Sequence, residues 1–217
     1  MADVTFDNGK LSTLYVHELW WLSSSLIRKA EYLFEEAKTP ESGYLLQVSP
    51  ELHSVIASIL ADAANIKKML VTPSAKLNGE SGGQSRLRKE RANRLKALIG
   101  DVELKEILNH KVRNTLEHFD EYIDEANVKL SKAKTPPSPM AAYNMILSHW
   151  EVTNPPVYPV RVYISSEKMF YNLKWKVNIG LLYEEAMAII GELKKVPGLD
   201  QEEGPGGLML RLDGPNA

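Results

Sequence analysis

Apolar residues recur at helical spacing along most of the chain. Segments of this kind run from Leu11 to Lys38, from Pro50 to Leu70 and, over a shorter length, from Gln84 to Ile99. A fourth runs from Asp101 to about Leu130, and a fifth from Gly180 to Val196. Apolar side chains three and four residues apart gather on one face of an α-helix, so each segment predicts an amphipathic helix.

Capping residues support these boundaries. Ser49 followed by Pro50 is typical of a helix start, because the serine side chain accepts a backbone N–H and proline suits the first helical position. Gly100 is a stop signal, and Asp101 directly after it is a candidate cap for the fourth helix. The glycine-rich stretch 71–85 predicts a loop between the second and third helices.

The pattern changes after residue 130, where prolines interrupt the chain. A short helix is predicted over 140–150, and alternating apolar residues predict strands over 160–164 and 169–177, joined by a turn at 165–168. The expected fold class is therefore mainly α, an up-and-down bundle of four to five helices with a small C-terminal β-hairpin at about 158–177. We expect residues 1–197 to form a single helical domain that includes the hairpin, and residues 198–217 to form a flexible Gly/Pro-rich tail.

Composition narrows the class of protein. The 217 residues are 44% hydrophobic and 25% charged, with a formal net charge of −2, which is ordinary for a globular domain. There is no cysteine, so disulfides, thiolate nucleophiles and cysteine metal sites are excluded. The acidic, polar start is unlike a signal peptide, and no apolar run approaches the roughly 20 residues that cross a bilayer. We expect a soluble, cytoplasmic protein with no membrane contact.

The fourth predicted helix holds the most suggestive chemistry. At 100° per residue, Asn114 and His118 lie one turn apart on the face opposite its apolar stripe, and Arg113 lies on the flank. That placement argues against a buried structural role for His118, and His110 is a minor candidate nearby. The apolar stripe consists of Leu104, Leu108, Val112, Leu116, Phe119, Ile123, Ala126 and Leu130.

The arrangement Arg113-Asn114-x-x-x-His118 resembles the R-x4–6-H motif of the HEPN superfamily (higher eukaryotes and prokaryotes nucleotide-binding), and Arg113 to Glu121 also resembles uncharacterised bacterial proteins with that fold. The resemblance implies a helical bundle that forms a homodimer and, in active members, metal-independent RNA cleavage where the motifs of two protomers meet. It implies His118 as general acid/base, Arg113 as phosphate clamp and Asn114 as the residue that orients them. Histidine titrates near neutral pH and arginine stabilises a phosphorane, so these residue types suit the reaction.

A second feature is independent of that motif. Six basic residues crowd into 86–96 with Glu90 as the sole acid, a local net charge of +5. Such a stripe is typical of a phosphate-binding surface, but it also fits a solvated helix face paired with the acidic run at 117–125, or a site for a protein partner. The six are Arg86, Arg88, Lys89, Arg91, Arg94 and Lys96.

Two functional hypotheses follow. The first is a HEPN-like endoribonuclease that cleaves RNA through its 2′-OH, such as the toxic component of a defence system. The second is a HEPN-like helical module without catalysis, which binds RNA, nucleotide or a partner protein such as an antitoxin. Neither requires a cofactor or a metal. His17-Glu18 begins like a zinc motif, but Trp21 stands where the second histidine would be.

Overall fold

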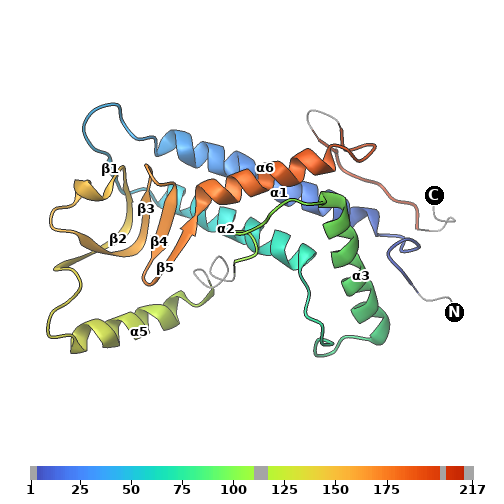
Figure 1. The fold of residues 1–217 in the computed structure, drawn as a ribbon, viewed down its shortest axis with the longest axis horizontal. Coiled ribbons are helices and arrows are strands. Elements are labelled where there is room, and N and C mark those ends of the chain that lie inside the picture. Colours follow the sequence, from blue (N-terminus) through green and yellow to red (C-terminus); the bar gives the residue numbers. More distant parts are fainter. Residues whose placement is uncertain (1–3, 110–116, 201–203, 213–217) are drawn as a thin grey trace.

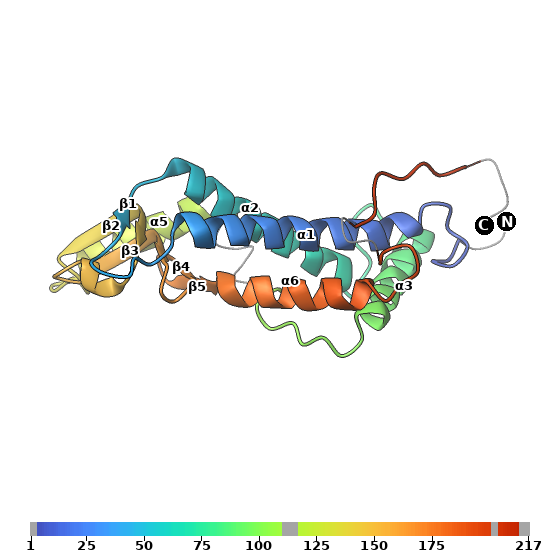
Figure 2. The same cartoon turned by 90° about the horizontal axis from the view of Figure 1, so that it is seen from above.

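The computed structural model describes residues 4–109, 117–200 and 204–212. Three long helices run alongside one another: α1 (Thr13–Glu36), α2 (Pro50–Leu70) and α6 (Ile179–Leu193). A β-sheet lies at one end of this layer, and helix α3 (Gly82–Ile99) crosses the other end (Figures 1 and 2). Helix α5 (Phe119–Lys132) lies beside the sheet, far from α3.

The helix signals at the start of α2 and α3 act as the sequence predicts. The Ser49 hydroxyl accepts the Leu52 N–H at 3.2 Å, and Pro50 is the first residue of α2. Helix α3 begins two residues before the prediction, because Ser81 and Gln84 form a reciprocal capping box. Gly100 ends α3 with a φ of 57°, a backbone conformation that most other residues avoid.

The prediction of a mainly α bundle is wrong. A mixed five-stranded sheet makes the fold α/β, with strand order β1-β2-β3-β4-β5. Strands β2 and β3 are parallel, and the other neighbours are antiparallel. The strands are β1 (Leu46–Gln47), β2 (Met140–Leu147), β3 (Val157–Ile164), β4 (Met169–Asn172) and β5 (Trp175–Asn178).

Two local errors led to that expectation. The segment 140–150 was predicted to be helical, but its residues Met140–Leu147 form β2 because they pair on both sides with other strands, and a short 3-10 helix (Trp150–Val152) begins at its last residue. The predicted hairpin is present as β3 and β4, but its second strand is broken into β4 and β5 by a turn at Leu173, whose φ is 55°. A short apolar run fits a helix or a strand equally well, so its long-range partners decide.

The predicted fourth helix is wrong over its first nine residues. Residues 101–109 are not helical, residues 110–116 lie outside the described residues, and α5 begins at Phe119. The backbone N–H groups of Lys105, Glu106 and Ile107 donate to the Glu185 carboxylate of α6 at 2.6, 2.8 and 2.8 Å. Amides that bond to this side chain do not join a helical ladder, so tertiary structure overrides the local helical pattern.

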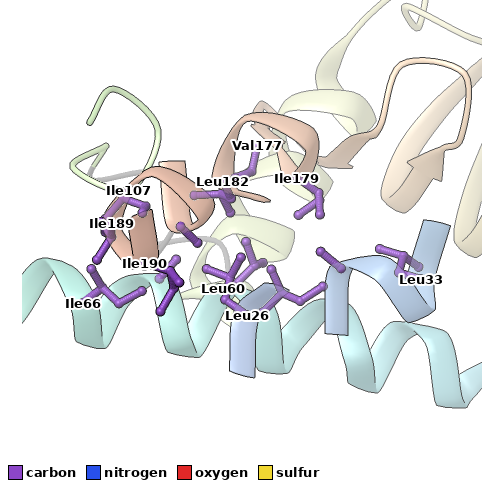
Figure 3. Close-up of a cluster of buried hydrophobic side chains, with 14 of the residues drawn as sticks. Leu26, Leu33, Leu60, Ile66, Ile107, Val177, Ile179, Leu182, Ile189 and Ile190 are labelled. Carbon is purple, nitrogen blue, oxygen red and sulfur yellow. The ribbon is translucent and has the colours of Figure 1, made fainter. Parts of the chain in front are cut away.

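The main core fills the space between the three long helices and one face of the sheet. Figure 3 shows Leu26 and Leu33 of α1, Leu60 of α2 and Leu182 of α6 converging there, with Ile107 inserted beside α6. The opposite face of the sheet is covered near Leu147 by the β2–β3 connection, which contributes Trp150. Helix α5 packs on the sheet through Phe119, Tyr122 and Ala126, against Tyr158, Val160 and Leu173.

Candidate functional site

His118 lies on open surface immediately before α5. Its side chain is 44% exposed, and Nδ1 lies 3.3 Å from Oε1 of Glu121, which is itself 71% exposed. Arg113 and Asn114, the other two predicted catalytic residues, and His110 lie outside the described residues. Among the residues that the structure describes, the polar partner of His118 is therefore a solvated carboxylate.

Aromatic side chains flank His118 and engage the neighbouring cations. The His118 ring meets the Tyr122 ring at 6.3 Å between centroids, and Tyr122 meets Trp175 at 5.8 Å. Lys174 Nζ lies 5.0 Å from the Tyr122 centroid and forms an ion pair with Glu125. These contacts occupy Lys174, so it is not free to stabilise a developing negative charge at His118.

Three of the six predicted RNA-binding residues contact other segments of the chain, and Arg88 makes the most of these contacts. The Arg88 guanidinium donates to Glu80 from Nε at 2.7 Å and also bonds to the carbonyls of Pro73 and Ala75. Hydrogen bonding from Arg88 holds the pKa of Glu80 at about 2. Arg88 therefore fixes the loop between α2 and α3.

Arg91 and Arg94 tie α3 to two other segments. Arg91 donates to the Lys68 carbonyl at the end of α2 at 3.1 Å, and its guanidinium lies 5.3 Å from the Tyr15 ring centroid. Arg94 pairs with Asp7 at 2.5 Å, although both side chains remain more than half exposed. A surface pair of this kind is weak, so Arg94 is available to an anion in a way that Arg88 is not.

The remaining basic residues, Arg86, Lys89 and Lys96, form the exposed basic face of α3. All three are exposed, and neither Lys89 nor Lys96 forms an ion pair with another described residue. At 100° per residue, Lys89 and Lys96 lie within about 20° of each other on the helix. Glu90 is occupied elsewhere, since it accepts the Phe6 N–H at 2.9 Å. The predicted +5 segment thus divides into a structural side and a solvent-facing side.

Glu185 is a structurally important residue that the sequence reasoning missed. It is 4% exposed and accepts the three N–H groups that hold residues 105–107. In return, Glu106 accepts the Asn178 N–H at the start of α6. The sequence does indicate a buried carboxylate here. Glu185 lies within the apolar stripe of the helix, between Leu182 and Ile189, and a carboxylate buried there requires hydrogen-bond donors.

A cavity of about 1120 Å³ lies between the start of α1 and the C-terminal segment. His17 lines it, and burial lowers the pKa of that histidine. Gly204 borders the region, with a φ of 75° and its Cα packed so closely on Trp20 that an added Cβ would fall 1.8 Å from the ring. The described lining of the cavity includes Asp7, Lys10 and Arg211, charges of both signs, and so indicates no single ligand class.

Across the described ranges, no three His, Asp or Glu side chains are placed to hold a metal ion. Nor does any helix described there have both the length and the apolar character to cross a membrane. Comparison of the chain with protein-family models, curated proteins and solved structures finds no match. Functional inference therefore depends on the surfaces of the molecule itself.

Proposed function

We propose that this protein binds RNA, without cleaving it, through the exposed basic face of α3. The observation that carries this proposal is that Arg86, Lys89 and Lys96 face solvent, while the one acid of the segment, Glu90, is held by the N-terminal segment. A nucleic-acid backbone is recognised mainly by exposed Lys and Arg side chains that replace its counterions.

The geometry of α3 suits an extended strand. Ten residues separate Arg86 from Lys96, which is about 15 Å along a helix at 1.5 Å per residue. Because Arg88 and Arg91 hold the loop and α2 in place, the cations are presented from a rigid support.

Binding is favoured over cleavage by the surroundings of His118. Its described polar partner is Glu121, and the acids Asp120 and Asp124 lie on the exposed side of the same helix. Negative charge so close to the histidine repels a phosphate. Cleavage by Arg113, Asn114 and His118 remains a prediction from the sequence, and the same experiment can detect it.

The test is fluorescence anisotropy of a labelled single-stranded RNA at increasing salt in EDTA. Three phosphate contacts predict a slope of log K against log salt of about −2, at about 0.7 per contact. Lys89→Glu with Lys96→Glu should abolish most of the binding at low salt. The matched control, Lys38→Glu with Lys176→Glu, makes the same charge change at exposed positions on other elements and should bind nearly as wild type.

Two results would contradict the proposal. One is the absence of binding at low salt, and the other is equal weakening by the α3 variant and its control. The RNA should also remain intact throughout, and His118→Ala should bind as wild type. RNA cleavage that disappears in His118→Ala would favour the catalytic hypothesis instead.

A further inference from the structure

Helix α5 carries an exposed face whose charge is opposite to that of α3. Asp120, Glu121 and Asp124 are exposed, and Asp124 lies about 160° around the helix from the buried Ala126. We call these three residues the acidic face of α5. The helix packs on the sheet through its other side, so this face points into solvent.

The two faces are balanced in charge. The exposed basic face of α3 carries three cations, and the acidic face of α5 carries three anions. Asp120 and Asp124 form no ion pair with any other described residue, as is also the case for Lys89 and Lys96. The near-neutral total of −2 therefore conceals two local charges of opposite sign.

The faces do not meet within one molecule. Helix α3 crosses one end of the long helices, and α5 lies beside the sheet at the other end, in both views (Figures 1 and 2). Each face is part of a rigid helix of comparable length, 18 residues in α3 and 14 in α5. A second copy of the chain can therefore present the opposite charge to each face.

We propose that the acidic face of α5 from one copy docks on the exposed basic face of α3 in a second copy, and so competes with RNA for that face. The competition with RNA rests on the proposed function, whereas the docking of one copy on another does not. Charge complementarity favours a second copy as the occupant, because one chain exposes the two helix faces at opposite ends.

The expected association is weak and strongly dependent on salt. Individual exposed ion pairs contribute about 0–1 kcal/mol, so several must act together. The exposed Val128, on the same side of α5 as Asp124, adds apolar area to the contact. Screening shortens the reach of these charges from about 30 Å at 0.01 M salt to about 3 Å at 1 M.

Sedimentation velocity of the full chain without RNA tests the docking. We expect association at about 0.01 M salt and monomers at about 1 M. Asp120→Lys with Asp124→Lys should prevent association, as should Lys89→Glu with Lys96→Glu. The four changes combined should restore it, because the charges are then exchanged rather than lost. The control Lys38→Glu with Lys176→Glu should associate like wild type.

The docking would be overturned if the wild-type protein stayed monomeric at low salt, or if the variant with all four substitutions failed to associate. For the competition, adding single-stranded RNA should dissociate the wild type, and the Asp120→Lys/Asp124→Lys variant should bind RNA at lower protein concentration. If the protein associates but RNA leaves the association unchanged, the proposed competition with RNA is refuted, whereas the proposed docking between copies is not. If that monomeric variant binds no RNA, the proposed function fails independently of self-association.

Discussion

Removal of the Glu185 carboxylate is the sharpest test of how the fold is held together. This buried side chain accepts three backbone N–H groups, from Lys105, Glu106 and Ile107, at 2.6 to 2.8 Å. Glu185→Ala leaves those donors without their acceptor and opens a space beside α6. These three bonds anchor residues 105–107 to α6, so their loss should lower the stability of the fold.

The magnitude follows from the contacts. A hydrogen bond to a charged group contributes about 1.5–3 kcal/mol, but three that share one carboxylate are not additive, and freed donors regain water. Ile107 remains inserted beside α6 and limits how far the segment can move (Figure 3). We therefore expect Glu185→Ala to lower the free energy of unfolding by about 3 kcal/mol, which is large for a single substitution.

Urea unfolding followed by circular dichroism measures this loss, and hydrogen exchange should show faster exchange at residues 105–107. Glu184→Ala is the matched control, because it removes an exposed carboxylate from the adjacent position of α6 and should change stability by less than about 0.5 kcal/mol. A loss below about 1 kcal/mol for Glu185→Ala, or equal losses for the two variants, would refute the anchoring role.

Three further outcomes are expected. Ser81→Ala removes the capping box of α3 and should destabilise the protein by about 1 kcal/mol in urea unfolding, whereas Ser81→Asp should not. Gly204→Ala cannot keep the backbone against Trp20, so tryptophan emission should shift to the red while the unfolding midpoint changes little. The pKa of Glu80 is lowered to about 2 in the folded protein, so its contribution to stability is present above its ordinary pKa and is lost as the pH falls from about 4.5 to about 2. Glu80→Gln should make the free energy of unfolding depend less on pH over that range. An unchanged pH dependence would contradict the contribution of the Arg88 contact.

Local signals in the sequence were sufficient for the helices whose ends are set by their own caps. Ser49 with Pro50 and the stop at Gly100 need no distant partner, and both appear in the structure. The sheet could not be recognised in the same way. Strand β2 depends on β1 and β3, which lie far away in sequence, and its short apolar run favours no single structure by itself.

The candidate site was only partly predictable for a similar reason. Clustering of basic residues on α3 is visible in the sequence, but which of them face solvent depends on the fold. Arg88 is held by Glu80 and by loop carbonyls, contacts that no local pattern indicates. The helical projection placed His118 within a helix, whereas the structure places it immediately before α5, and its pairing with Glu121 required coordinates.

Lysine footprinting tests the central claim most directly. Surface lysines of the full chain are acetylated with and without a single-stranded RNA, at low salt and at a protein concentration at which the chain is monomeric, and modification is read at each residue by mass spectrometry. The account predicts that RNA protects Lys89 and Lys96 of α3 and leaves Lys38 and Lys176 unprotected. Protection that is uniform over the surface, or that is absent from α3, would contradict it.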